Sequence, residues 1–287
     1  ASARGARKAR KNNKGGGKRQ RAQQRAQYDE LDKYPVLPPH AFARIVRDKQ
    51  TLNIIYQIIE PPMTKKEQEQ RDEILDIFIR SLTANIEEID ANPEAYIRTA
   101  MDKVIKAYGM KINKKSKSKI FYYLRRDLIG YGEMDVLMND INVEDISLDG
   151  TNVPIFAYHR KFESVETTCV WKTDEELESY VIKLAQRCGK HISVADPLLD
   201  ATLMDGSRIV MKLGREVSTR GSAFCIRRFK DDPFSPADIV AFRTMSSLMV
   251  AYLWIAFQNE VPMLFVGGTA SGKTTTLNAM CIFIPWQ

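Results

Sequence analysis

Cysteine is scarce and scattered in this 287-residue sequence. The four cysteines are Cys169, Cys188, Cys225 and Cys281, and no two of them form a CxxC pair. The three histidines do not cluster with them. Zinc sites and disulfide-stabilised domains depend on closely spaced ligands or paired cysteines. We therefore expect neither, and predict free thiols in a reducing cytoplasm.

Long apolar runs are missing as well. No stretch approaches the roughly 18 uninterrupted apolar residues that a membrane-spanning helix needs. No apolar core follows the basic start of the chain, as it would in a targeting signal. If the protein acts at a membrane, we expect it to act from outside the bilayer.

Acidic residues are absent from residues 1–28, which contain ten lysines or arginines. The other 33 basic residues face 36 acidic ones, so this tail accounts for the net charge of +7. The tail has almost no large apolar side chains, and we predict that it is disordered. It is interpreted as a solvated extension, as a contact for an anionic membrane surface, or as a contact for nucleic acid. The near-neutral body argues against nucleic acid.

Residues 29–130 are predicted to form a helical N-terminal region. It begins with "YPVLPP", which reads as an extended connector because proline excludes helix. Apolar residues then recur every three or four positions over 64–90, and a second helix runs from the cap Asn92 to Gly109. A third helix is expected over 114–129. We expect these three helices to pack together.

Residues 131–230 are predicted to form a small α+β domain with a mostly antiparallel sheet. "VEDISLDG", "VPIFAYH", "SVETTCVW" and "AFCIRRF" have strand length and strand composition. "LLDATLMDGSRIVMKL" reads as a hairpin that turns at Asp205-Gly206. Between them, "TDEELESYVIKLAQRCG" predicts a helix that Thr173 caps.

Residues 231–287 are predicted to hold a linker, "KDDPFSPADIV", and the beginning of an α/β domain. A helix over 246–259 leads to "VPMLFVGG", which has the composition of a buried strand, and then to a glycine loop and a helix that includes Leu277 and Met280. Strand, glycine loop and helix form the setting that a phosphate-binding loop requires.

The glycine loop, "GGTASGKT", fits the pattern GxxxxGK[ST] without a mismatch. Its backbone N–H groups and the following helix N-terminus suit a phosphate, Lys273 suits the β- and γ-phosphates, and Thr274 suits Mg²⁺. The predicted cofactors are ATP and Mg²⁺. The predicted nucleotide-binding residues are Gly267, Gly268, Thr269, Ala270, Ser271, Gly272, Lys273, Thr274 and Thr275.

The acidic residue that hydrolysis would need is missing from the segment after the glycine loop. The 13 residues after Thr274 contain no aspartate, glutamate or histidine, so the sequence has no Walker B motif. Hydrolysis needs an acidic residue near the metal and a group that positions water. We expect the chain alone to be inactive, and interpret it as a truncated product, a fragment or a split domain.

These motifs carry a family resemblance. "GGTASGKTTTLNAM", preceded by "SSLMVAYLWIAFQNEVPMLFVGG" and "RGSAFCIRRF", closely resembles the archaeal branch of the secretion-ATPase superfamily. This branch holds the motors of type IV pili, type II-like secretion and the archaellum. "YYLRRDLIGYGEMDVLMNDINVEDISLDGTNVPIFAYH" also resembles the family. The resemblance is strong over about residues 110–287 and looser over the helical region.

The resemblance implies an N-terminal domain over a RecA-like domain, a ring of six copies, and ATP between the two domains. It implies a partner, the membrane platform protein of a pilus or secretion system, and a cytoplasmic place on the inner face of the cell membrane. Arginines near the end of the N-terminal domain would reach the phosphates, since guanidinium groups bind oxygens in a fork geometry. The matching positions are Arg208, Arg220, Arg227 and Arg228.

Three functions compete at this stage. The first is an ATP-driven motor for filament assembly or protein secretion, of which this chain supplies the N-terminal domain and the nucleotide loop. The second is a non-hydrolysing nucleotide-binding or interaction module. The third is a DNA-translocating ATPase of the conjugation type, against which the near-neutral body argues.

Overall fold

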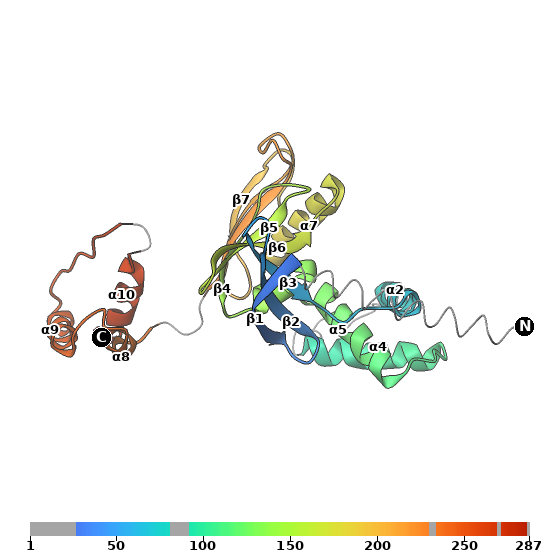
Figure 1. The fold of residues 1–287 in the computed structure, drawn as a ribbon, viewed down its shortest axis with the longest axis horizontal. Helices are drawn as coiled ribbons and strands as arrows, with labels where there is room; N and C mark the ends of the chain where they lie inside the picture. The colour runs from blue at the N-terminus through green and yellow to red at the C-terminus, as the bar shows by residue number, and fades with distance from the viewer. Residues whose placement is uncertain (1–26, 81–91, 230–233, 269–270, 286–287) are drawn as a thin grey trace, which may run out of the picture. The chain divides into compact units, whose positions relative to one another are not determined.

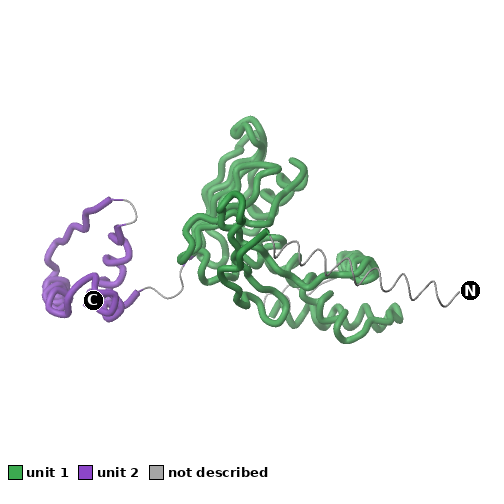
Figure 2. The backbone as a smooth tube through the Cα atoms, viewed as in Figure 1, with its two compact units in different colours: residues 1–228 green, residues 229–287 purple. Residues whose placement is uncertain are grey.

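The computed structural model describes residues 27–80, 92–229, 234–268 and 271–285. The chain divides into two compact units, residues 1–228 and 229–287 (Figure 2). The predicted disordered tail falls almost wholly on residues 1–26, outside the described residues. The last part of the helix predicted over 64–90 also lies outside them, from residue 81 onward.

A nine-stranded sheet forms the centre of the first unit (Figure 1). Its strand order is β1-β2-β3-β6-β5-β4-β9-β8-β7. Every neighbouring pair is antiparallel except β3 and β6, so the prediction of a mostly antiparallel sheet is confirmed. The strands are β1 Tyr28–Leu37, β2 Ala41–Asp48, β3 Ile54–Ile59, β4 Val143–Leu148, β5 Pro154–His159, β6 Glu163–Val170, β7 Leu198–Thr202, β8 Arg208–Lys212 and β9 Ala223–Arg227.

The first three strands correct the prediction of a helical region over 29–130. The segment "YPVLPP", predicted as a connector, lies largely within β1, where Pro35 pairs with Phe42 of β2. β1 is one of the two edge strands of the sheet. An edge position tolerates proline because the missing N–H need not face a neighbouring strand. The sheet therefore begins about 100 residues earlier than the α+β domain predicted over 131–230.

The helical block consists of α2 Lys65–Arg80, α4 Pro93–Ala107 and α5 Lys114–Leu128. The Asn92 side chain accepts a hydrogen bond from the N–H of Ala95, so it caps α4 as predicted. One face of each helix is apolar and buried against the other two. The buried residues of this shared core are Ile74, Phe78, Ile97, Met101, Val104, Ile120 and Leu124. The predicted packing of three helices is thus confirmed.

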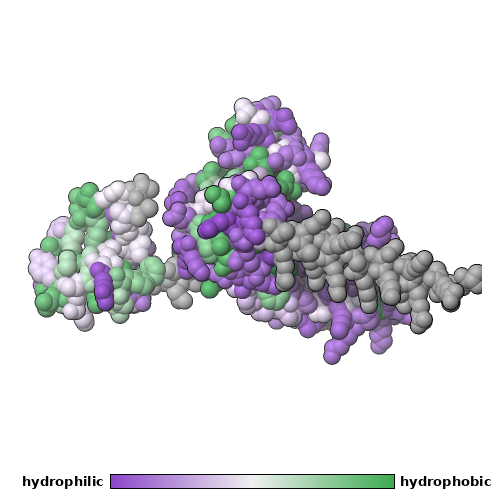
Figure 3. Space-filling view, viewed as in Figure 1, coloured by the Kyte–Doolittle hydropathy of each residue, from purple (hydrophilic) through white to green (hydrophobic). Residues whose placement is uncertain are grey.

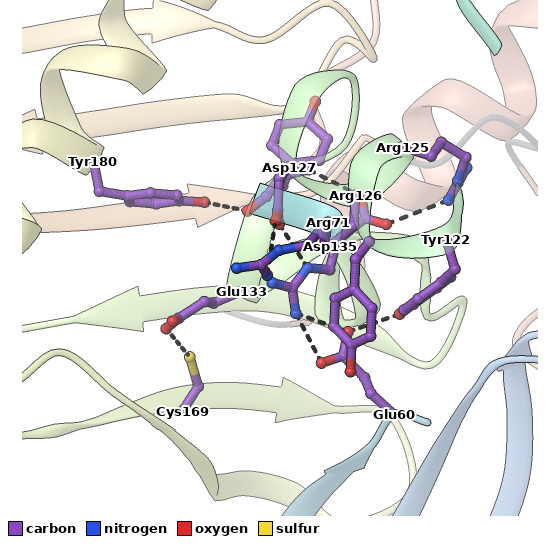
Figure 4. Close-up of polar contacts among 12 residues, drawn as sticks. Glu60, Arg71, Tyr122, Arg125, Arg126, Asp127, Glu133, Asp135, Cys169 and Tyr180 are labelled. Carbon is purple, nitrogen blue, oxygen red and sulfur yellow. Dashed lines mark hydrogen bonds and ion pairs between the residues drawn. The ribbon is translucent and has the colours of Figure 1, made fainter. Parts of the chain in front are cut away.

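Polar contacts join the helical block to the sheet (Figure 4). The Arg126 guanidinium of α5 lies 2.8 and 3.0 Å from the two carboxylate oxygens of Glu60, which directly follows β3. The hydroxyl of Tyr122 donates a 2.7 Å hydrogen bond to the same carboxylate. Charge-assisted bonds of this kind hold α5 at the end of β3.

Helix α7, Asp174–Arg187, begins at the predicted cap Thr173, which accepts a hydrogen bond from the N–H of Glu176. Its buried residues Leu177, Val181 and Leu184 belong to the core of the sheet. The ring centroid of Trp171 lies 4.8 Å from that of Tyr180 on α7. The hairpin β7–β8 also forms as predicted, with its turn over 203–207. The 3-10 helix η1, Gly132–Met134, and α6, Asp135–Asn139, lead into β4.

The second unit contains α8 Pro236–Ala241, α9 Ser247–Gln258, α10 Lys273–Met280 and the 3-10 helix η2 Cys281–Phe283. The helices α9 and α10 were predicted. Part of the predicted linker over 230–240 instead forms α8, because Ser235 and Asp238 make a capping box. Residues 230–233 of that linker lie outside the described residues.

The strand predicted for "VPMLFVGG" does not form. Residues 261–268 have no strand assignment, because no other segment of the described second unit pairs with them. Leu264 and Val266 are largely exposed, and Figure 3 shows hydrophobic residues on the visible face of this unit.

Candidate nucleotide-binding site

The predicted phosphate-binding loop connects residues 259–266 to α10. Gly272 is the N-cap of α10 and has a φ of +81°, a left-handed conformation that glycine adopts without strain. The helix then starts with a 2.9 Å hydrogen bond from the N–H of Thr276 to the carbonyl of Gly272. The loop thus delivers Lys273 and Thr274 to the first turn of the helix, where backbone N–H groups have no intrahelical partner.

Contacts inside the loop converge on the carbonyl oxygen of Gly268. The Ser271 hydroxyl donates a 2.8 Å hydrogen bond to it, and the Lys273 ammonium also donates to it. A Cβ at Gly267 would lie 2.6 Å from the Ser271 hydroxyl oxygen, whereas a Cβ at Gly268 would meet nothing within 4 Å. Crowding therefore favours glycine at 267. Thr269 and Ala270 lie outside the described residues.

The remaining predicted loop residues are accessible to a ligand. Thr274 and Thr275 are exposed, and Lys273 is half-buried. At its other end α10 is anchored, because Ala279 and Met280 are buried against Ile239 and Val250. The exposed end of α10 is therefore its N-terminus, which is the positive end of the helix dipole.

Acidic groups are few in the second unit. Among its described residues, only Asp238 and Glu260 are acidic. The Asp238 carboxylate accepts hydrogen bonds of 2.8 and 2.7 Å from the N–H and hydroxyl of Ser235. The described parts of the chain contain no group of three histidine, cysteine, aspartate or glutamate residues that could hold a metal ion. The chemistry of Lys273 and of the first turn of α10 suits an anion, whereas the described residues hold no cluster of acidic side chains for Mg²⁺ beside Thr274.

The arginines predicted to reach phosphate lie in the first unit, and each unit is described by itself. Arg208 and Arg227 are opposite one another on β8 and β9. Both are exposed, and both are paired with aspartates on neighbouring strands. Arg208 lies 2.5 Å from Asp200, and Arg227 lies 3.2 Å from Asp145. The Arg208 guanidinium lowers the pKa of Asp200 through hydrogen bonding. A phosphate would have to replace these carboxylates.

Arg220 and Arg228 have different surroundings. The Arg220 side chain is exposed, and its carbonyl oxygen accepts a 3.1 Å hydrogen bond from the N–H of Thr151. Arg228 is half-buried, and its guanidinium donates to the backbone carbonyls of Asp140 and Val143. Those bonds tie the end of the first unit to the start of β4. They favour a structural role for Arg228, and its contact with phosphate stays a prediction.

Two cavities lie apart from the loop residues. One, of about 450 Å³, is in the second unit and is lined by Phe257, Glu260, Val261, Ile284 and Pro285. The other, of about 780 Å³, is a groove in the first unit beside α7, with Arg126, Glu133 and Tyr180 among its lining residues.

The groove in the first unit offers no reactive thiol. Cys169 lies next to Glu133 (Figure 4), and its sulfur donates a 3.6 Å hydrogen bond to that carboxylate. Burial, followed by the charge of Glu133, raises the pKa of the Cys169 thiol, which keeps it neutral. The hydroxyl of Tyr180 is likewise occupied, because it donates a 2.6 Å hydrogen bond to the carbonyl of Tyr131.

Sequence reasoning missed a lysine cluster on the helical block. Seven lysines and no acidic residue lie between Lys103 and Lys119. The sequence carries this signal, but acidic residues elsewhere in the body cancel these lysines in the net charge.

Within the described residues, no helix is both long and apolar enough to cross a bilayer.

Comparison with known proteins finds relatives of undescribed activity. No protein-family model matches the chain. The chain is 33% identical over 256 residues to the uncharacterized protein MJ0900 of Methanocaldococcus jannaschii. The aligned region covers 88% of this chain and 45% of MJ0900. The chain is also 39% identical over 164 residues to the uncharacterized protein MJ1288 of the same organism. This aligned region covers 57% of this chain and 65% of MJ1288. The chain therefore spans less than two thirds of each of these relatives.

Two solved structures are similar to part of the fold. The VirB11 ATPase of the Brucella suis type IV secretion system, in complex with sulphate, is 21% identical, with a TM-score of 0.28 and coverage of 52% of each chain. The ATPase DotB of Legionella pneumophila is 16% identical, with a TM-score of 0.28, and covers 50% of this chain and 38% of DotB. Scores of this size are too low to transfer a mechanism.

Proposed function

We propose that this chain binds ATP through the loop Gly267–Thr274 and forms part of an ATP-driven motor. The carrying observation is the position of Lys273, whose ammonium folds back onto the carbonyl of Gly268 at the open N-terminal end of α10. A terminal phosphate offers the ammonium stronger, charged acceptors than one carbonyl does. Binding would therefore exchange this internal bond for bonds to the β- and γ-phosphates, with backbone N–H groups around them.

The finer proposal is a motor for pilus-like filament assembly or protein secretion. Its support is the resemblance of "GGTASGKTTTLNAM" and the upstream segments to archaeal secretion ATPases. In this proposal Mg²⁺ binds at Thr274, and positive charge at the phosphates comes from Arg208, Arg220, Arg227 and Arg228. A ring of six copies, a membrane platform partner and a place at the inner face of the cell membrane belong to the same proposal.

A second candidate is a module that binds nucleotide without hydrolysing it. It is favoured by the scarcity of acid in the described second unit, where Asp238 is committed to the Ser235 cap. Without a carboxylate near the metal and a group that positions water, bound ATP has no route to rapid cleavage. The two candidates share the binding step and differ in turnover.

Titration calorimetry of the full chain with Mg-ATP tests the binding step. The variant Lys273→Ala is expected to bind ATP about 10- to 100-fold more weakly, because it loses a charged donor to the phosphates. The matched control is Lys212→Ala, since Lys212 is an exposed lysine of β8 in the other unit. Equal affinity of the wild type and Lys273→Ala would contradict the proposed site.

Phosphate release separates the two candidates only in a version of the chain extended through a Walker B motif, because this chain is expected to be inactive in both cases. Turnover by the extended version that Lys273→Ala abolishes supports the motor, and binding without turnover by the extended version supports the non-hydrolysing module. If the wild type shows normal helix content by circular dichroism but no ATP binding, both candidates are contradicted, and an interaction module that binds a partner through the helical block is favoured.

A further inference from the structure

The turn between α4 and α5 carries an unusual density of positive charge. Residues 103–119 contain seven lysines, no acidic residue and no arginine. Two of the seven form ion pairs with acidic residues of the helical block. The Lys117 ammonium lies 2.5 Å from Asp102, and the Lys119 ammonium lies 3.3 Å from Glu67 and 2.9 Å from the carbonyl of Pro62.

The other five lysines are exposed, and the structure gives them no acidic partner among the described residues. They are Lys103, Lys106, Lys111, Lys114 and Lys115. Together with Tyr108, whose side chain is 62% exposed, they form what we call the lysine tip. None of the five is needed to neutralise a carboxylate of the fold.

The backbone brings the members of the lysine tip to one end of the helix pair. Lys103 and Lys106 are three residues apart near the end of α4, so they lie on one side of that helix. The chain then reverses at Gly109, which has a φ of +60°. Lys114 and Lys115 are the first two residues of α5. Figure 1 shows this turn at the outer end of α4 and α5, and the helices pack on a shared core.

The lysine tip is only partly favourable for the fold. Lys106 lies in the last turn of α4, where the helix dipole favours a cation. Lys114 and Lys115 occupy the first turn of α5, where the helix dipole favours acidic residues, and that turn contains none. Like charges close together also repel one another. Lysines that oppose the dipole of α5 and lack acidic partners in the described residues point to an external anion.

We propose that the lysine tip binds an anionic membrane surface. Tyrosine is suited to the headgroup layer because its ring is apolar and its hydroxyl is polar, and Tyr108 lies between the two groups of lysines. Lysine is a point charge on a flexible stem, which suits mobile lipid phosphates, and residues 103–119 contain no arginine, whose planar fork suits nucleic-acid recognition. A turn at the end of two helices meets a plane more readily than it follows a strand. The proposal is independent of the nucleotide loop.

The expected strength follows from the number of lysines. Each lysine near an anionic membrane surface strengthens binding about fivefold at physiological salt. The triple variant Lys111→Gln/Lys114→Gln/Lys115→Gln should therefore bind about 100-fold more weakly. It should remain folded, because all three side chains are exposed and two of them oppose the dipole of α5.

The experiment is co-sedimentation of the full chain with vesicles of phosphatidylcholine, with and without one third phosphatidylglycerol. The matched control is Lys33→Gln/Lys172→Gln/Lys212→Gln, which removes the same charge from exposed positions elsewhere in the first unit. The tip variant is expected to bind the anionic vesicles more weakly than the wild type, and the control to change binding by less than about threefold. Each comparison is made in the full chain and again without residues 1–28, because the ten basic residues of that tail also attract anionic lipid. Tyr108→Ser should weaken the same binding severalfold with no change in net charge.

Two results would overturn the proposal. One is equal loss of vesicle binding in the tip variant and the control, which would assign the attraction to net charge alone. The other is unchanged vesicle binding in the tip variant. If the tip variant then binds a duplex DNA more weakly than the wild type, the tip is a nucleic-acid contact instead. Circular dichroism of each variant confirms that the helices are retained.

Discussion

The hydroxyl of Tyr56 donates a 2.7 Å hydrogen bond to the carboxylate of Asp140, 84 residues further along the chain. The hydroxyl of Tyr34 donates to the same carboxylate oxygen at 2.6 Å and also lies 2.9 Å from Nε2 of His159. Asp140 is 1% exposed, and its other oxygen accepts from the N–H of Asn142. This buried network joins β1 and β3 to the start of β4.

Substitutions in this network should show how much it contributes to the free energy of unfolding. Tyr56→Phe is expected to lower the free energy of unfolding by about 1.5–3 kcal/mol, because it removes a hydrogen bond to a buried charge. Asp140→Ala should cost more, about 3–5 kcal/mol, since both tyrosine hydroxyls lose their acceptor. Urea unfolding at neutral pH measures both. Equal costs for the two variants would show that the carboxylate does not link the strands.

Glu67 should make stability depend on pH in the acid range. Its carboxylate accepts a 2.6 Å hydrogen bond from the Ser116 hydroxyl and a 2.8 Å bond from the N–H of Thr64, and these bonds lower its pKa to about 2. Because the folded pKa is depressed, this stabilisation is present above the ordinary pKa of 4.5 and is lost as pH falls toward about 2.

The variant Glu67→Gln isolates that contribution. At neutral pH its free energy of unfolding is expected to be about 1–2 kcal/mol lower than that of the wild type, because the charge-assisted bonds become neutral ones. The difference should shrink between pH 4.5 and pH 2 as the wild-type carboxylate is protonated. Urea titrations across that range check it. A difference that stays constant with pH would contradict the assigned pKa.

Gly150 should tolerate no side chain. A Cβ there would lie 2.2 Å from the carbonyl oxygen of Arg220, and the φ of Gly150 is +120°. Gly150→Ala is expected to cost about 3 kcal/mol or more, because backbone must move as well as adopt a strained conformation. Gly189→Ala is the matched control, since Gly189 has a φ of +66° with nothing within 4 Å of the added atom. It should cost about 1–2 kcal/mol. Thermal unfolding of the two variants compares them.

Asp200→Asn tests whether Arg208 can bind a phosphate of ATP. Both side chains are exposed, and their ion pair should contribute little to stability. If Arg208 contacts ATP, removing the competing carboxylate is expected to raise ATP affinity severalfold with no change in the unfolding transition. The measurement is titration calorimetry beside Arg208→Gln, which should bind ATP more weakly than the wild type. Unchanged affinity in both variants would assign Arg208 to the sheet surface alone.

Local signals in the sequence predicted the elements that local forces determine. Asn92 and Thr173 mark helix starts because their side chains satisfy free N–H groups, and the apolar period of α5 reflects one buried face. The glycine loop was likewise predicted from spacing, because Gly272 must adopt a left-handed conformation directly before α10.

Long-range pairing could not be predicted in this way. Pro35 reads as a helix and strand breaker, yet β1 forms because an edge strand needs no N–H at that position. Conversely, residues 261–266 have strand composition but no neighbour to pair with in the described second unit. The Asp140 network was also hidden, since its tyrosines lie 84 and 106 residues from it.

The parallel contact between β3 and β6 has a consequence for synthesis on the ribosome. The N–H of Ile58 bonds to the Thr168 hydroxyl, 110 residues later, at 3.3 Å. At ordinary translation rates the partner emerges roughly 5–20 s after β3. During that interval the nascent β1–β3 segment lacks its neighbour and presents an unpaired edge to chaperones and to other nascent chains. The edge of β3 that faces β6 is therefore covered only after more than 100 further residues have been made, although β1, β2 and β3 can already pair with one another.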